Sequence, residues 1–348
     1  MNLVLVGLLV AGPVWASEAT TPAPPKTVPA LLLDGGRKLV YAGSFNSEHE
    51  VKPKRGFWTK VVDVIAGAPD YRTLVSPYAV TTDSRGRIIV TDPGAFGVHL
   101  FDFAQQKYKF LTRSDKDKDE TLAPQCVAVD AQDNIYVTDS EAGKIFVWNA
   151  DGKYQRAIGS LKGGEGFFKR PTGIAIDSAQ QRIYVTDTLR NKIYVLDMQG
   201  RVLQIIGQTG TGKGEFNYPT ELRLNGADLV VVDAMNFRVQ VLDRSGGFKY
   251  AVGKLDDRAG GMFRPKGIGF DSEGHLYVVD GMWGIVQVFN GEGQLLYYFG
   301  NGTGLGQFQM PAGLQIDSGD QVFVVDSYNR RIEVFRYYGL TKQAQGGK

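Results

Sequence analysis

The chain of 348 residues contains one cysteine, Cys126, and three histidines. A single cysteine cannot form an internal disulfide, and no C-x-x-C spacing is present to hold zinc or attach haem. Neither sign of charge dominates, since 39 Lys and Arg stand against 37 Asp and Glu, which argues against a general binder of polyanions. Glycine is abundant instead. The 44 glycines, together with 43% hydrophobic residues, predict many short strands joined by tight turns.

Long apolar runs are also missing. The run from Leu3 to Ala11 is too short to span a bilayer, and small residues follow it before Ser17. This is the shape of a secretory signal peptide, although Met1-Asn2 lacks the usual Lys or Arg. We therefore expect residues 1–16 to be a signal peptide and the protein to be exported, to the periplasm or the extracellular space. Residues 17–30 read as a proline-rich tether, and we expect no transmembrane segment in the mature chain.

A repeat organises the rest of the chain. Its first mark is a proline that recurs with spacings of 47, 47, 48, 46 and 46 residues, at Pro77, Pro124, Pro171, Pro219, Pro265 and Pro311. Its second mark is a strand that ends in aspartate, at Asp92, Asp139, Asp187, Asp233, Asp280 and Asp326. Two further β-rich segments complete each unit, the last of them ending in glycine. Six units of four short strands predict an all-β fold, a six-bladed β-propeller.

The sixth unit lacks its fourth strand at the C-terminal end. Residues 38–45 have the pattern of a fourth strand without a unit of their own, so we expect them to complete the sixth blade and close the ring. Apolar residues between 57 and 65 predict one short amphipathic helix before the first repeat. The predicted layout is a closing strand and helix in 31–76, the propeller in 77–340 and a flexible tail in 341–348.

The marks PTGIAID, IYVTDTLRNKIYVLD and LQIIGQTGTGKGEFNYP resemble the NHL repeat. The Gly-x-Gly-x-Phe-x-x-Pro join and the turn from Asp233 to Arg238 carry the resemblance, which covers residues 77–338. It implies a six-bladed propeller whose ends are binding surfaces. It does not choose a use, because similar propellers include RNA binders, protein-interaction modules, sensors, lyases and lactonases.

The six repeated aspartates resemble a carboxylate cluster. A catalytic group is needed once, however, whereas these occur in every unit at the same place. Aspartate at a strand end accepts hydrogen bonds from turn N–H groups, so we interpret the six as structural. By the same logic, the basic residues five positions later should join neighbouring blades. These are Lys144, Lys192, Arg238 and Arg331.

Departures from the repeat carry more information. Two residues after each proline, small side chains are expected where the sheets converge, yet the fourth unit has Glu221 there. Arg223 departs in the same way two residues later. Residues i and i+2 of a strand share a face, so the two should pair beside the central channel. A structural ion pair is the simpler interpretation, and a small-ligand site is the alternative.

The turns after the aspartate strands should lie at the same end of the ring as the prolines. We expect their large residues to be exposed together with Lys169, Arg170, Arg264 and Lys266, forming a protein or ligand interface. These turn residues are Phe96, Leu189, Arg190, Met235, Phe237, Met282, Trp283, Tyr328 and Arg330. Packing of these side chains on neighbouring loops is the alternative.

An enzymatic interpretation has less support. A lyase of the propeller type would need histidines in the channel, and His49, His99 and His275 fall elsewhere. Glu221 is the one carboxylate that departs from the repeat on an inner strand. We therefore predict a monomeric, non-enzymatic binding scaffold with no cofactor and no metal, whose partner is a protein or envelope component and not nucleic acid. The competing hypothesis is a metal-dependent hydrolase or lyase that uses Glu221.

Overall fold

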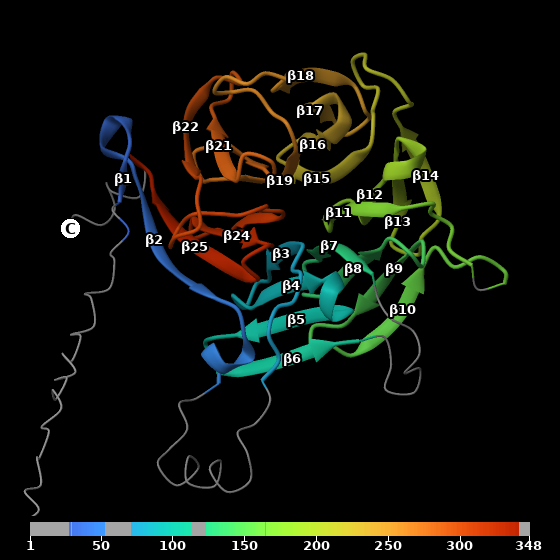
Figure 1. The fold of residues 1–348 in the computed structure, drawn as a ribbon. Helices are drawn as coiled ribbons and strands as arrows, with labels where there is room; N and C mark the ends of the chain where they lie inside the picture. Colours follow the sequence, from blue (N-terminus) through green and yellow to red (C-terminus); the bar gives the residue numbers. More distant parts are fainter. Residues whose placement is uncertain (1–27, 29, 53–70, 113–122, 164, 341–348) are drawn as a thin grey trace, which may run out of the picture.

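The computed structural model describes residues 28, 30–52, 71–112, 123–163 and 165–340. These residues form six antiparallel sheets, one of five strands and five of four, arranged around a central axis (Figure 1). The fold is the all-β, six-bladed propeller predicted from the repeat. None of the helices in the described ranges is long and apolar enough to cross a membrane.

Each blade runs from the axis outward. The innermost strands are β3 (Ala79–Thr82), β7 (Pro124–Val129), β11 (Pro171–Asp177), β15 (Pro219–Asn225), β19 (Pro265–Phe270) and β23 (Leu314–Ile316). The second strands are β4 (Ile88–Asp92), β8 (Ile135–Asp139), β12 (Arg182–Asp187), β16 (Asp228–Asp233), β20 (Leu276–Asp280) and β24 (Gln321–Asp326).

The two remaining strands of each blade lie toward the rim. The third strands are β5 (Gly97–Asp102), β9 (Lys144–Trp148), β13 (Lys192–Asp197), β17 (Arg238–Asp243), β21 (Ile285–Phe289) and β25 (Arg331–Tyr338). The outer strands are β6 (Lys107–Leu111), β10 (Tyr154–Ile158), β14 (Val202–Ile206), β18 (Phe248–Val252), β22 (Leu295–Gly300) and β2 (Lys38–Phe45).

Burial explains the composition of these strands. The second strands are covered by a neighbouring blade on each face, so β4, β8 and β20 are buried at every position and consist mainly of β-branched residues. The outer strands have one wet face, and β6 alternates exposed and covered residues. Inner strands need small residues: a Cβ added to Gly173 would lie 2.8 Å from the Cα of Glu221 in the next blade.

The first described strands belong to the last sheet, whose order is β1-β2-β25-β24-β23, with β1 at Leu31–Leu32. Strand β2 pairs with β25 from Lys38↔Tyr338 to Phe45↔Ile332, and Figure 1 shows the blue and red ribbons side by side. The predicted closing strand thus lies in the sixth blade; that it locks the ring in solution stays a prediction. The predicted helix at 57–65 lies outside the described residues.

The repeated aspartates have the structural role expected of them. Each ends its second strand almost fully buried. Asp280 accepts hydrogen bonds from the backbone N–H groups of Phe263 at 2.7 Å, in the proline loop, and of Met282 at 2.9 Å, in the following turn. The carboxylate therefore joins two loops at one end of the blade.

The predicted joining role of the basic residues holds for the two arginines. Arg238 Nε binds Asp233 at 2.9 Å, and its Nη2 donates to the carbonyls of Gly212 and Glu215 in the loop arriving from the preceding blade. Arg331 makes the equivalent contacts in the sixth blade.

Short 3-10 helices fill several of the loops. Three follow aspartate strands: η3 (Pro93–Ala95), η4 (Thr188–Arg190) and η5 (Ala234–Asn236). Two lie near the N-terminus: η1 (Asp34–Gly36) and η2 (Glu48–Glu50). We use the name loop face for the end of the propeller formed by the turns after the aspartate strands and the loops that lead to the prolines.

Candidate binding face

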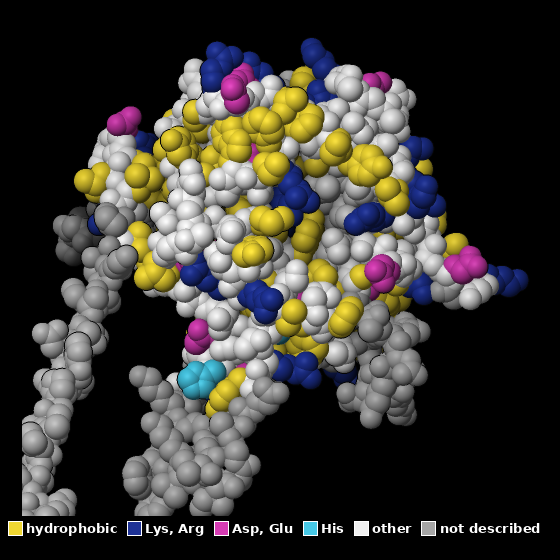
Figure 2. Space-filling view, in the orientation of Figure 1, with side chains coloured by type: hydrophobic (Ala, Val, Ile, Leu, Met, Phe, Trp, Pro, Cys, Tyr) yellow, Lys and Arg dark blue, Asp and Glu magenta, His cyan; other side chains and the backbone are white. Residues whose placement is uncertain are grey.

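Large apolar side chains are exposed in both kinds of loop on the loop face. Met282 is 69% exposed and Tyr328 63% exposed. The others exposed there include Val75, Phe96, Tyr218, Met235 and Met310. Figure 2 shows hydrophobic side chains mixed with Lys and Arg near the middle of this end. Aromatic, Met and Arg side chains gathered in this way are typical of interfaces.

The turn residues that the sequence placed together differ in their exposure in the structure. It exposes Phe96, Met235, Met282, Tyr328 and Arg330. It leaves four only half-exposed: Leu189, Arg190, Phe237 and Trp283. For these four, the predicted exposure is only partial.

Two of the half-exposed side chains are engaged by neighbouring loops. The Arg190 guanidinium lies 3.1 Å from Asp187, donates to the carbonyl oxygen of Phe167 and lies over that residue's ring. The Trp283 ring packs against Phe263 with centroids 5.5 Å apart. Packing on neighbouring loops, the alternative interpretation, therefore describes these two residues.

The turn before each third strand requires a left-handed backbone. In the second and fifth blades, the residue directly before the third strand is a glycine with positive φ, Gly143 or Gly284. In the first, fourth and sixth blades it is Phe96, Phe237 or Arg330, each with φ of 56°. A side chain there costs about 1–2 kcal/mol relative to right-handed backbone, so three blades keep bulky groups where glycine fits more easily.

One concavity on the loop face lies where the first and last blades meet. We call it the seam cleft; its volume is about 740 Å³, within the range of about 300–1,000 Å³ usual for small-ligand sites. It is lined by Val75, Ser76, Pro77, Tyr78, Pro93, Lys266, Met310, Ser327, Tyr328 and Arg330. The sequence placed Lys266, Tyr328 and Arg330 at this end of the ring without predicting a cleft. It did not single out Tyr78 or Met310.

Lys266 is the chemically unusual member of the cleft. It is half-buried, and its Nζ lies 5.4 Å from the centre of the Tyr78 ring. Burial, with a smaller contribution from the nearby Arg264 charge, lowers the pKa of Lys266 to about 8. Comparison of the residue after each repeated proline could have identified this site: Tyr78 and Lys266 stand where the other blades have Gln125, Thr172, Thr220 and Ala312.

Glu221 and Arg223 form the predicted pair beside the channel. Arg223 Nη2 lies 2.9 Å from Glu221 Oε1. The same arginine donates to the carbonyl oxygens of Ile268 and Leu314, at 3.4 and 3.2 Å, and so connects the fourth blade to the fifth and sixth. Burial raises the pKa of Glu221 to about 7, against the opposing attraction of Arg223. These contacts favour the structural interpretation of the pair.

The remaining reactive groups do not converge. Cys126 is buried, and burial raises the pKa of its thiol well above the ordinary value. His99 is buried beside Tyr108 in the first blade, and His275 binds Asp271 at 2.8 Å at the opposite end. His49 lies in η2. Within the described ranges, no three His, Cys, Asp or Glu side chains are grouped to hold a metal ion.

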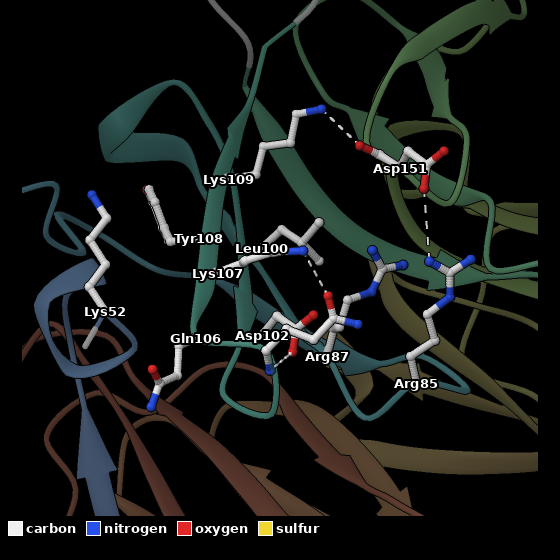
Figure 3. A pocket seen from close by; sticks show the side chains of 11 residues that line it. Lys52, Arg85, Arg87, Leu100, Asp102, Gln106, Lys107, Tyr108, Lys109 and Asp151 are labelled. Carbon is white, nitrogen blue, oxygen red and sulfur yellow. Dashed lines mark hydrogen bonds and ion pairs between the residues drawn. The ribbon is translucent and has the colours of Figure 1, made fainter.

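A second concavity of about 500 Å³ lies at the opposite end, on the first blade (Figure 3). Its cations are used by the fold. Arg87 Nε binds the buried Asp83 at 2.6 Å, and Lys109 Nζ donates to the backbone carbonyl of Asp151 at 2.8 Å. Lys107 Nζ donates to Gln105 at 2.9 Å.

Comparison with known proteins agrees with this architecture. Residues 116–183 and 174–257 match a family model described as a six-bladed β-propeller, and residues 308–335 match the NHL repeat. The comparison with curated proteins gave no match.

Solved structures share the fold at low sequence identity. A streptogramin B lyase is 16% identical, with a TM-score of 0.56 over 76% of this chain and 94% of that one. Virginiamycin B lyase from Staphylococcus aureus, in a catalytically inactive form with quinupristin, is 16% identical with a TM-score of 0.55, over 76% and 84%. An auxiliary nutrient binding protein from Bacteroides thetaiotaomicron is 11% identical with a TM-score of 0.59, over 76% and 70%. At these identities the likeness is one of fold.

Proposed function

We propose that this six-bladed propeller of NHL type is an exported, non-enzymatic binding scaffold that engages a protein or cell-envelope component through its loop face. The observation that carries the proposal is the set of large apolar side chains exposed there, with Met282 and Tyr328 each more than 60% exposed. Loops held by a rigid scaffold are where binding residues concentrate, and exposed Met and aromatic groups are costly to keep in water unless a partner covers them.

The test compares two pairs of substitutions of similar exposure. Met235→Ala with Met282→Ala removes apolar surface from the loop face, where the two residues are 52% and 69% exposed. Leu203→Ala with Tyr298→Ala is the control, because these residues are each 53% exposed but lie on the outer strands β14 and β22. Each purified protein is used to capture partners from an envelope extract by crosslinking. The proposal requires the partner to be lost with the first pair only, at unchanged melting temperature.

Export rests on the signal-like segment at residues 1–16, which lies outside the described residues. Expression of the full chain in a secreting host, followed by mass measurement of the product, tests it. Cleavage before Ser17 or Thr20 is expected; an intact N-terminus inside the cell would contradict export.

The alternative is a metal-dependent hydrolase or lyase with its site in the channel. The buried Glu221 carboxyl, whose pKa is raised to about 7, is the group in its favour, since perturbed carboxyls are common in active sites. Metal analysis of the purified protein and ligand-induced melting shifts test it. Stoichiometric metal that is lost on Glu221→Ala would replace the binding scaffold with this alternative.

A further inference from the structure

The seam cleft is a cationic site without a counter-charge of its own. Two of its ten lining residues, Lys266 and Arg330, are basic, and none is acidic. Within the described ranges, neither side chain has an ion pair with a carboxylate. The half-buried position of Lys266 is unfavourable for an unpaired cation, so the cleft is complementary to a negatively charged group.

Lys266 supplies the first cation. Its Nζ lies over the ring of Tyr78, the residue just before β3, and this ring accommodates a cation but provides no negative charge. Arg264, in the loop that leads to β19 and so to Lys266, adds a repulsive positive charge. Burial raises the pKa of the Tyr78 hydroxyl, so the tyrosine remains neutral. An anion in the cleft would therefore meet an ammonium group that nothing else neutralises.

Arg330 supplies the second cation from the turn between β24 and β25. It is exposed and has a φ of 56°, at the position where the fifth blade has Gly284. The turn geometry alone would favour glycine or asparagine there. Its backbone N–H donates to the carbonyl oxygen of Ser327, and its exposed guanidinium is accessible to a ligand.

The rest of the lining selects the kind of anion. Pro77 and Pro93 have no N–H to donate, and the backbone N–H groups of Tyr328 and Arg330 already donate to carbonyl oxygens, so few backbone donors of the lining remain to cradle a phosphate. Met310 and Tyr328, at 48% and 63% exposed, add an apolar rim. Side-chain cations beside an apolar rim fit carboxylates on a chain that also has apolar side chains.

We propose that the seam cleft binds an acidic peptide segment, with its carboxylates against Lys266 and Arg330 and an apolar side chain against Met310 and Tyr328. The proposal rests on the binding function proposed above and names the chemical class of the partner segment. Charge complementarity of this kind mainly sets specificity and the association rate.

The experiment measures fluorescence anisotropy of labelled ten-residue peptides with the full chain. The first peptide alternates glutamate with leucine; its two counterparts have glutamine or lysine in place of glutamate. Inorganic phosphate is added as a competitor. We expect the glutamate peptide to bind at least tenfold more tightly than either counterpart. Its affinity should fall as the salt concentration rises, and millimolar phosphate should not displace it. Equal binding of the glutamine peptide, or its displacement by phosphate, would overturn the acidic-peptide assignment.

Three variants locate the binding. Lys266→Met keeps an apolar stem but removes the charge, and Arg330→Asn places a residue that tolerates positive φ, as Asn191 does in the third blade. Each substitution should lower the affinity for the glutamate peptide at least tenfold without lowering the melting temperature of the protein. Lys153→Met, at an exposed lysine of the opposite end, is the control and should leave binding unchanged. Unchanged binding in both cleft variants would exclude the cleft.

A second measurement follows Lys266 itself. The charged groups that face it in the described structure are Arg264 and Arg330, and the neutral titratable groups are Tyr78 and Tyr328. A carboxylate bound beside the ammonium group should raise its pKa above about 8. Affinity is then full below pH 8 and falls as the pH rises above it, a decline that Lys266→Met should abolish.

The two proposals fail in different ways. If the glutamate peptide does not bind but the Met235 and Met282 substitutions still release the captured partner, the loop face binds a partner of another chemistry. If the peptide binds in the cleft while those two substitutions leave capture intact, the apolar surface is not the interface.

Discussion

At the scale of single residues, Glu221 shows how a departure from a repeat can serve the fold. Its carboxyl is buried where other blades have small residues, and its partner Arg223 also contacts the carbonyls of two other blades. Above pH 7 the Glu221 carboxyl is ionised, and breaking the buried pair from one side there leaves an uncompensated charge and costs about 3–5 kcal/mol. Arg223→Met should therefore lower the free energy of unfolding by that amount in denaturant titration. A loss below 1 kcal/mol would contradict the connecting role of Arg223.

The pH dependence of stability tests the same carboxyl by another route. The folded pKa of Glu221, about 7, exceeds its ordinary value of 4.5. Between these pH values the folded state holds a proton that the unfolded state has released, so stability falls as pH rises through this window. The shift corresponds to about 3 kcal/mol. Relative to the native chain, Glu221→Gln should gain about that much between pH 4 and pH 8 in denaturant titrations. Glu292→Gln, at an exposed turn, is the control; parallel profiles for Glu221→Gln and the native chain would contradict the raised pKa.

At the scale of elements, strand β2 completes a blade whose inner strands come from the other end of the chain. It pairs with β25 along its length and buries Leu39 and Phe45, while Arg37 just before it binds Glu273 of the fifth blade at 2.7 Å. Without β2, the edge of β25 would be unpaired, and unpaired edges promote aggregation. A chain that begins at residue 47 should therefore melt lower and over a broader range than one that begins at residue 31, and it should aggregate on heating. Scanning calorimetry with light scattering measures both; identical transitions would show that β2 does not close the ring.

At the scale of the whole molecule, the sequence predicted the number of blades and the place of each strand, because one pattern recurs six times. Small residues such as Gly173 and buried carboxylates such as Asp280 reveal their roles by recurrence alone. The seam cleft does not recur. It combines Lys266 of the fifth blade, Tyr328 of the sixth and Tyr78 of the first, so no single unit contains its signal. The partial burial of Trp283 was equally beyond a repeat pattern, because its packing against Phe263 separates it from the exposed Met282 beside it.

A closed ring also predicts that the six blades unfold together. Open repeat arrays have two free ends and can lose units separately, whereas every blade of a ring packs against two neighbours. Val90 of β4 and Val231 of β16 are fully buried in the first and fourth blades.

Val90→Ala and Val231→Ala each create a cavity that should cost about 1–3 kcal/mol. Since the whole ring shares one transition, each variant should shift a single calorimetric peak to lower temperature without splitting it. In the chain that begins at residue 47, the same substitutions should act on separate peaks, because the interrupted ring behaves as an array. Split peaks in the intact chain would show that the blades are stabilised individually and that β2 contributes only to its own sheet.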